Sequence, residues 1–222
     1  MGIPTARIYR NAAFSLAALF TSSNAFAGWQ ENASPAEIDR LNQLPQIRDA
    51  AVADAQQRSS REPERSEGLG VRPLKNGEGR GDWRVISRVM GPEARTIPAN
   101  VLAGNWRCRQ LKLGLMSSYM VYDRWFTCSI RPTRGGLLLE KTNGSQRFAG
   151  WLYPEQGAWV YLGASSVAGE PRHHYSGASP ALGAAVTPDD QIGLLTGIGD
   201  NHLRLEIPAV QESLLDVVEF TR

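Results

Sequence analysis

Two cysteines within one stretch of strand-like residues limit the folds open to this chain. Residues 104–130, GNWRCRQLKLGLMSSYMVYDRWFTCSI, hold both cysteines in a pattern typical of two strands that fold back on each other. The midpoint between Cys108 and Cys128 falls in the polar pair Ser117-Ser118. A hairpin that turns there places the cysteines directly opposite each other, about 4.5–5.5 Å apart at Cα, within reach of a disulfide. We therefore predict a hairpin closed by a Cys108–Cys128 disulfide.

The N-terminus has the tripartite layout of a secretory signal peptide. Arg7 and Arg10 form a basic lead, residues 12–20 are almost continuously apolar, and Ala25-Phe26-Ala27 is a small-x-small cleavage sequence. The apolar part is too short for a membrane-spanning helix, and no later segment is long enough. We expect cleavage before Gly28 and a soluble mature chain in the periplasm or secreted medium.

The charge balance gives no support for a polyanionic partner. All 22 acidic residues follow the expected cleavage site, as do 22 of the 24 basic ones, so the mature side chains sum to zero. A neutral chain is a poor candidate for binding nucleic acid or an anionic membrane. The cysteines are not in a C-x-x-C arrangement, and an even count in an exported chain favours a structural disulfide over a redox pair.

The first part of the mature chain is predicted to be helical. Residues 34–37 form a capping box with proline at the first helical position, and apolar residues recur at helical spacing up to Ala55. Pro45 should kink this helix or split it. The predicted division is a signal peptide at 1–27, a helical segment at 28–57, a flexible polar linker at 58–81, and a domain of one short helix plus β-strands at 82–222.

The C-terminal part has the pattern of an all-β domain. Short strands are predicted at 104–114, 119–131, 137–142, 145–153, 158–164, 191–197, 202–208 and 214–222. Gly104-x-Trp106 is similar to the G-x-W signature of lipocalin-like barrels, in which the tryptophan plugs the closed end. The last strand is apolar on both faces, so that one face can point inward and the other can lie under the helix. We predict a mainly β fold: a small antiparallel, closed or nearly closed barrel of about eight strands, lipocalin-like, with one or two N-terminal helices packed outside.

Four short motifs give a family resemblance. They are CR at 108–109, K-x-x-G-S-Q-R at 141–147, LRLEIP at 203–208 and LDVVEF at 215–220. With these motifs the chain resembles a bacterial exported family, the domain of unknown function 4893, over most of its mature length. That resemblance implies a periplasmic location and carries no activity. A looser likeness in architecture, a G-x-W strand with a cysteine-bridged hairpin, links the chain to periplasmic metalloprotease inhibitors.

One group of polar and aromatic residues is a candidate binding surface or barrel-end cluster. Its members come from the first strand and from the hairpin around Asn143: Trp106, Arg109, Ser145, Gln146, Arg147, Trp151 and Tyr153. Arginine beside aromatics is common at binding surfaces, and it is equally typical of a plug in which arginine stacks on the G-x-W tryptophan. The segment 165–190 is longer than most structureless connections and is interpreted as a lid over the barrel mouth, with Tyr175 as its aromatic contact.

Catalytic and metal sites are not predicted. His173-His174 with His202 and Asp189 or Asp190 could be proposed as metal ligands, but adjacent histidines seldom bind one ion, and a solvated loop is the simpler interpretation. Asp216 and Glu219 lie three apart on a strand and therefore face opposite sides. The sequence contains no nucleophile elbow, P-loop or dinucleotide fingerprint, and we predict neither an enzyme nor a cofactor.

One further pair of charges is expected on the surface. Arg204 and Glu206 share one face of a predicted strand, opposite three apolar residues. The ordinary interpretation is an exposed ion pair on the outside of the barrel.

Two functions remain open at this point, and a hydrolase, which would need three polar side chains converging in one cleft, ranks behind both. The first is a non-enzymatic binding protein that holds a small apolar ligand at the barrel mouth, which requires a cavity of roughly 300 Å³ or more. The alternative is a solid barrel that serves as a scaffold for contact with a periplasmic protein, for example as a protease inhibitor. The oligomeric state is not predicted.

Overall fold

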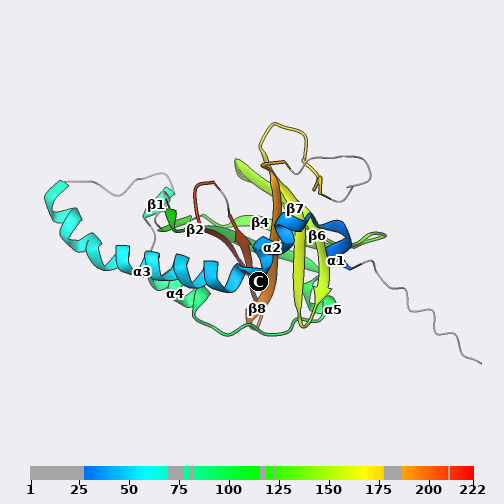
Figure 1. The fold of residues 1–222 in the computed structure, drawn as a ribbon, viewed down its shortest axis with the longest axis horizontal. Coiled ribbons are helices and arrows are strands. Elements are labelled where there is room, and N and C mark those ends of the chain that lie inside the picture. The colour runs from blue at the N-terminus through cyan, green and yellow to red at the C-terminus, as the bar shows by residue number, and fades with distance from the viewer. Residues whose placement is uncertain are drawn as a thin grey trace, which may run out of the picture.

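An eight-stranded antiparallel barrel makes up most of the computed structural model, and the long helix α3 extends away from it to one side (Figure 1). The structure describes residues 28–69, 78–80, 83–115, 119–122, 124–177, 187–209 and 211–222. The barrel strands are β2 (Gly104–Leu113), β4 (Phe126–Thr133), β5 (Gly136–Lys141), β6 (Gln146–Glu155), β7 (Ala158–Val167), β8 (Asp190–Gly199), β9 (His202–Pro208) and β10 (Leu215–Thr221). Each strand from β4 to β10 pairs with the next, and β2 pairs with both β10 and β4, which closes the ring. The predicted fold class is confirmed.

The first hairpin is present, but its register differs from the prediction. The second arm is interrupted, since β3 (Tyr119–Tyr122) pairs with the far end of β2 and β4 with its beginning. Cys108 lies opposite Phe126, and Cys128 lies opposite Trp106. The two cysteines are therefore diagonal neighbours on one face, 5.8 Å apart at Cα, and they form the predicted disulfide. The expectation that they face each other directly was wrong because counting from a central turn ignores the break between β3 and β4, and the expected turn at Ser117-Ser118 lies outside the described residues.

Five helices precede β2 in the described part of the chain: α1 (Trp29–Asn32), α2 (Pro35–Asn42), α3 (Leu44–Leu69), α4 (Trp83–Met90) and α5 (Ala99–Leu102). The predicted capping box at Ser34 and Glu37 starts α2, and the helix splits before Pro45, which lies in the first turn of α3. The predicted linker begins too early, because α3 continues to Leu69 and projects beyond the barrel (Figure 1). Arginine, glutamine and glutamate are good helix formers by intrinsic propensity. A three-residue strand, β1 (Glu78–Arg80), pairs with β3 outside the barrel.

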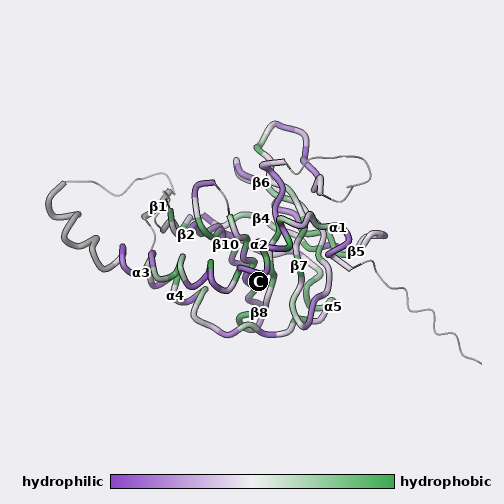
Figure 2. The backbone as a smooth tube through the Cα atoms, in the orientation of Figure 1, coloured by the Kyte–Doolittle hydropathy of each residue, from purple (hydrophilic) through white to green (hydrophobic). Residues whose placement is uncertain are grey.

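Three groups of buried side chains hold these parts together. The barrel interior is the largest, and the tube in Figure 2 shows most of the hydrophobic colour on the barrel strands. A second group lies between β2, β10 and the helices α3 and α4, and a third lies under α1 and α2. Strand β10 joins the first two, since Val218 and Phe220 point inward while Leu215 and Val217 pack under α3. The prediction that this strand is apolar on both faces because a helix covers its outer one is confirmed.

Candidate functional site

One end of the barrel is closed by tryptophan. Trp106, at the start of β2, is 2% exposed, and its indole N–H donates to the Leu102 carbonyl of α5 at 2.9 Å. The Arg222 guanidinium carbon lies 3.9 Å from the centre of its ring. A tryptophan plug with an arginine stacked on it is therefore present, and the arginine is the last residue of the chain instead of Arg109 or Arg147.

The other end of the barrel is polar. Because side chains alternate along a strand, the residues that follow Trp106 and Cys108 on the inner face of β2 are Gln110 and Lys112. Asp216 of β10 pairs with Lys112 across the sheet. These residues line a cavity of about 220 Å³ at this end, together with Arg40 of α2 and others from the strand ends and loops: Gln146, Arg147, Phe148, Ser165, Glu170, Asp189, Asp190, Gln191, Glu212 and Ser213. We call this cavity the mouth.

A charged pair sits at the mouth. The Lys112 ammonium donates to Glu212 at 2.8 Å and lies beside Asp216. Burial alone would lower the pKa of Lys112, but the neighbouring carboxylates of Asp216 and Glu212 outweigh it and raise the pKa above its ordinary value. Burial also raises the pKa of Asp216, against the opposing effects of Lys112 and of the Ser213 hydroxyl, which donates to Asp216 at 2.5 Å. The inner wall therefore carries Lys112, which is held in its charged form, and Asp216, whose burial opposes its ionisation.

Two polar atoms inside the barrel have no hydrogen-bond partner among the described residues. Gln191 Oε1 is buried on the wall of the mouth, and the Tyr161 hydroxyl is buried in the barrel core. Gln191 pairs across the sheet with Gly163, and a Cβ at Gly163 would meet the Tyr161 hydroxyl at 2.2 Å. Glycine at this position therefore leaves the space that the tyrosine ring occupies. A buried unpaired acceptor such as Gln191 Oε1 is costly unless a ligand or ordered water supplies a donor.

The loop that follows β7 is tied down at the rim of the mouth. Asp190 accepts hydrogen bonds from the backbone N–H groups of Ser176 at 2.9 Å and Thr187 at 3.0 Å, which holds the two described ends of the loop together. Tyr175, predicted to contact a ligand as part of a lid, instead donates its hydroxyl hydrogen to Glu37 of α2. It packs with the residues under α1 and α2 and does not line the mouth. Residues 178–186 of the predicted lid lie outside the described residues.

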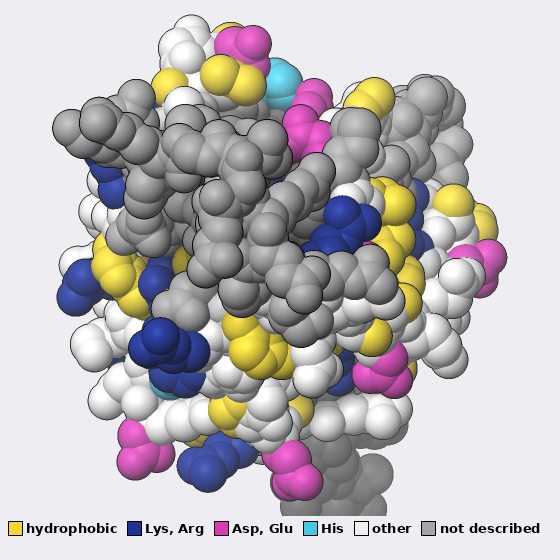
Figure 3. Space-filling view, turned by 90° about the vertical axis from the view of Figure 1, so that its left-hand side faces the viewer, with side chains coloured by type: hydrophobic (Ala, Val, Ile, Leu, Met, Phe, Trp, Pro, Cys, Tyr) yellow, Lys and Arg dark blue, Asp and Glu magenta, His cyan; other side chains and the backbone are white. Residues whose placement is uncertain are grey.

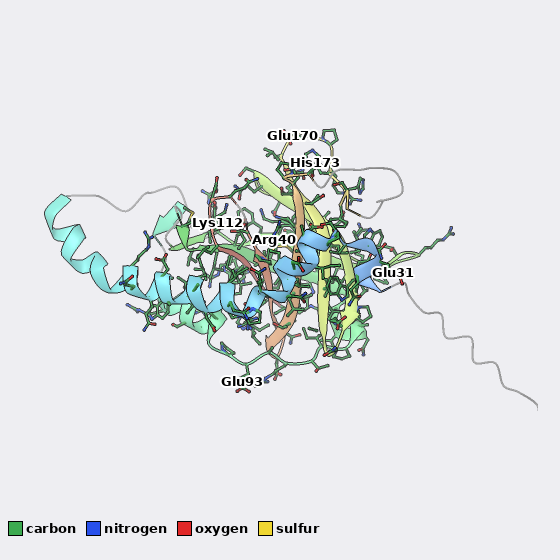
Figure 4. All side chains as sticks on the ribbon, in the orientation of Figure 1. Glu31, Arg40, Glu93, Lys112, Glu170 and His173 are labelled. Atoms are coloured by element: carbon green, nitrogen blue, oxygen red, sulfur yellow. A yellow bond between two sulfur atoms is a disulfide. The ribbon has the colours of Figure 1, made fainter. Side chains whose placement is uncertain are left out.

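The histidines are not brought together. His173 contacts Asp189 at 3.1 Å near the mouth, whereas His202 Nε2 lies 2.8 Å from Glu219 on the outer wall. Within the described ranges, no group of three or more His, Cys, Asp and Glu side chains is arranged to hold a metal ion. Figure 4 shows His173 at the same edge of the molecule as Glu170, with Lys112 and Arg40 lower down.

The cluster predicted from the sequence is divided among different parts of the barrel. Gln146 and Arg147 line the mouth, but Trp106 fills the opposite end. Arg109 faces outward, where it pairs with Glu219 at 2.6 Å and stacks on Trp125. The other predicted members are not among the mouth residues: Ser145, Trp151 and Tyr153. The sequence does contain a signal for two residues that the prediction missed. Side chains alternate along β2, so counting from the inward-facing Cys108 would have placed Gln110 and Lys112 on the inner wall near the mouth.

The ion pair predicted to be exposed is buried instead. Arg204 is 2% exposed and Glu206 is fully buried, and they are 3.0 Å apart. Arg48 of α3 holds the same carboxylate with two hydrogen bonds of 2.5 and 2.6 Å. Arg204 also donates to the Val89 and Met90 carbonyls at the end of α4. The expectation failed because a sequence pattern does not show that two helices cover this face.

Side chains at the mouth do not form an evident hydrolytic site. Ser213, Lys112 and Asp216 converge there, which is the kind of grouping a hydrolase requires. A lysine that acts as a base needs a lowered pKa, and the pKa of Lys112 is raised. The Ser213 hydroxyl donates to Asp216, so no lysine base is hydrogen-bonded to it among the contacts described above.

Comparison with protein families decides the classification. The model of the family described as "Domain of unknown function (DUF4893)" matches residues 29–220. The chain belongs to this family. The match covers the helices and strands described above, except for the last residue of β10, and confirms the resemblance drawn from the four motifs. A search of curated proteins finds no match. Among the helices in the described part of this family member, none has both the length and the apolar content that a bilayer span requires.

Proposed function

We propose that this protein is an exported, non-enzymatic binding protein whose barrel mouth holds a small polar ligand. Export is supported by the N-terminal sequence pattern and by the Cys108–Cys128 disulfide, which is typical of oxidising compartments. It is also compatible with the burial of Trp29, which is 6% exposed and follows the expected cleavage site by two residues. Cell fractionation should recover the protein in the periplasm, and its measured mass should correspond to a chain that starts at Gly28.

The binding proposal rests on the unpartnered Gln191 Oε1 in the mouth. This buried acceptor faces a cavity whose wall also carries Lys112 and Asp216. Leaving such an acceptor unpaired costs about 1–3 kcal/mol, which a donor group on a ligand would recover. The chemistry that fits is a molecule rich in N–H or O–H donors.

The lining argues against the apolar ligand expected from the sequence. Charged and amide side chains dominate the mouth, and the apolar residues of the interior lie toward the closed end. At about 220 Å³ the cavity is also below the roughly 300–1,000 Å³ of pockets for drug-sized molecules. A compact polar molecule suits both its size and its wall.

Thermal unfolding with candidate ligands tests this proposal. The protein is purified gently from its own periplasm, analysed by native mass spectrometry for a retained molecule, and screened with amino acids, monosaccharides and small amines. A ligand at about 100 times its Kd stabilises the fold by about 2.7 kcal/mol, a rise in Tm of about 5–10 °C for a chain of this size.

A pair of glutamine variants locates the site. Gln191→Leu should abolish the rise in Tm, whereas Gln46→Leu, on the exposed side of α3, should retain it. If no compound in the screen raises the Tm and no molecule is retained, the mouth is not a ligand site.

The second candidate function is a scaffold for contact with another periplasmic protein. It is supported by two features. The closed end and core of the barrel are filled by side chains, since Trp106, Tyr161 and Phe220 are each at most 2% exposed, and α3 projects beyond the barrel (Figure 1). Removing all of residues 28–81 would also remove Leu44 and Ala51 from the core, so a sharper test replaces only residues 60–77 with a glycine–serine segment. Loss of a partner captured from periplasmic extract would favour this function.

A further inference from the structure

Two arginines of β2 stack on the same tryptophan on the outside of the barrel. Arg107 and Arg109 lie on either side of the inward-facing Cys108 along the strand, so both point outward. Their guanidinium carbons lie 5.0 Å and 4.7 Å from the centre of the Trp125 ring, which belongs to the segment directly before β4. Trp125 is partly exposed and Arg107 is exposed. The two arginines are therefore neighbours through direct contact with one ring at the surface.

The carboxylate beside them is shared by several basic side chains. Glu219 of β10 is paired with Arg109 across the sheet and accepts a hydrogen bond from its Nε at 2.6 Å. The other carboxylate oxygen lies 2.8 Å from His202 Nε2 and 4.0 Å from Arg88 of α4. Arg107 forms no ion pair among the described residues. Positive charge on this part of the outer wall therefore exceeds the negative charge that Glu219 supplies.

One hydrogen-bond donor in this group is buried and unused. The Arg109 side chain is 9% exposed, and its Nη2 atom has no hydrogen-bond partner among the described residues. Glu219 and the Trp125 ring hold this guanidinium group in place. An arginine that is already ordered loses little conformational freedom when an acidic group binds near it. Arg109 thus supplies fixed positive charge, while Arg107 and Arg88, whose side chain is 58% exposed, supply charge that a partner can reach.

These side chains stand on the outside of the molecule and not in the mouth. We call them the arginine–tryptophan surface: Arg88, Arg107, Arg109 and Trp125. None of the four lines the mouth. In Figure 3, which views the molecule from the side to which α3 projects, basic and hydrophobic side chains lie next to each other in the left-hand half, and the acidic ones visible there lie near its upper and lower edges. The surface charge is thus unevenly distributed, although the mature side chains sum to zero.

We propose that the arginine–tryptophan surface is a docking site for an acidic segment of a partner protein. Arginine and tryptophan are enriched among the residues that dominate protein–protein binding energy. Carboxylates of the segment would pair with Arg107 and Arg88, whose charges Glu219 does not balance, and the rest of the segment would cover Trp125. The outer face of a sheet does not enclose a small molecule, but it offers a contact area to an extended segment. This surface goes beyond the proposed ligand at the mouth and does not require the projecting end of α3.

NMR of the tryptophan indole groups tests the surface with a defined probe. A hexaglutamate peptide is titrated into the isotope-labelled protein at low salt, and a hexaglutamine peptide serves as the control. The Trp125 indole signal, assigned from Trp125→Phe, should shift with hexaglutamate, whereas the signal of Trp106 at the closed end should not. Raising sodium chloride from about 50 mM to about 200 mM should weaken binding severalfold, because salt screens exposed charges.

Arg107→Gln is the decisive variant. The Arg107 side chain is exposed and forms no hydrogen bond or ion pair among the described residues, so the variant should fold with an unchanged Tm. It should weaken binding of hexaglutamate about tenfold. Arg134→Gln removes the same charge from the exposed β4–β5 turn, and it should bind the peptide as the unmodified protein does.

Three results would overturn the proposal. The first is a Trp125 signal that does not move at about 1 mM hexaglutamate, or an equal loss of binding in Arg107→Gln and Arg134→Gln. The second is an equal Trp125 shift with inorganic phosphate at the same concentration of charge, because the surface would then bind a small ion only. The third is a dimer in analytical ultracentrifugation that Arg107→Gln dissociates, because the occupant would then be a second copy of this chain.

Discussion

Replacing Glu206 with glutamine should destabilise the protein strongly. The carboxylate is fully buried between the barrel and α3, and both of its oxygens are in use. Oε1 accepts from Arg48 Nε, and Oε2 accepts from Arg48 Nη2 and from Arg204 Nε at 3.0 Å. Glutamine fits the space, but it removes the negative charge and turns an N–H group toward an arginine donor.

The magnitude follows from the burial of the arginines. Arg204 is 2% exposed and cannot reach water when its partner is neutralised, whereas the Arg48 side chain is 29% exposed and can. Breaking a buried ion pair by removing one partner costs about 3–5 kcal/mol. Since glutamine still accepts one hydrogen bond, we expect about 3 kcal/mol for Glu206→Gln, or a fall in Tm of about 6–12 °C. Arg48→Met should cost less, about 1–2 kcal/mol, because Glu206 keeps Arg204.

Urea unfolding followed by tryptophan fluorescence measures these free energies. The double variant Arg204→Met/Glu206→Leu replaces the buried pair with apolar side chains of similar size and leaves the Val89 and Met90 carbonyls without their donor. It should lose about 1–2 kcal/mol, less than Glu206→Gln alone. If Glu206→Gln costs under about 1 kcal/mol, or if the double variant is the less stable of the two, the account of this ion pair is wrong.

Three further outcomes are expected. Cys108→Ala/Cys128→Ala should lower the free energy of unfolding by about 3 kcal/mol, the chain-entropy value for a loop of this length, and dithiothreitol should then have no further effect on the urea midpoint. Because burial lowers the folded pKa of Lys141 to about 8, below its unfolded value of 10.5, its contribution to stability is present above pH 10.5 and is lost as the pH falls through 8. The stability of the unmodified protein relative to Lys141→Met should therefore rise by up to about 3 kcal/mol between pH 7 and pH 10.5 in paired unfolding curves, and a flat difference would contradict the lowered pKa. Tyr161→Phe removes a buried hydroxyl that lacks a partner among the described residues, so it should leave calorimetric stability unchanged or raise it by about 1 kcal/mol, and a loss above 1 kcal/mol would indicate a hydrogen-bonded hydroxyl.

The strands were the most predictable part of the fold. Their turns carry local signals, such as Asn143-Gly144 between β5 and β6, and their alternation needs no information beyond a few neighbouring residues. The prediction of α3 failed after Gln57, because composition alone does not distinguish a solvated helix from a loop. The register between Cys108 and Cys128 failed because the interruption between β3 and β4 has no strong turn residue to mark it.

The candidate site was harder to predict than the fold. Residues of the predicted cluster that are close in sequence, such as Arg147 and Trp151, share one face of β6, but they lie four residues apart along the strand and only Arg147 lines the mouth. Gln110 and Gln191 come from strands far apart in sequence and meet only at the end of the closed barrel. The sequence could place each of them on a strand face but could not show which ends of the eight strands coincide.

The sequence by itself determined the alternation of strands and turns, the capping box of α2 and the pairing of the only two cysteines, since each depends on local conformational preference or on short spacings. Tertiary structure alone decided which polar side chains became buried. Glu206 is buried because α3 covers β9, and the mouth is polar because the inward positions of six strands end on the same side. Burial changes the energy of a charge far more than sequence neighbours do, since it removes water from all sides at once.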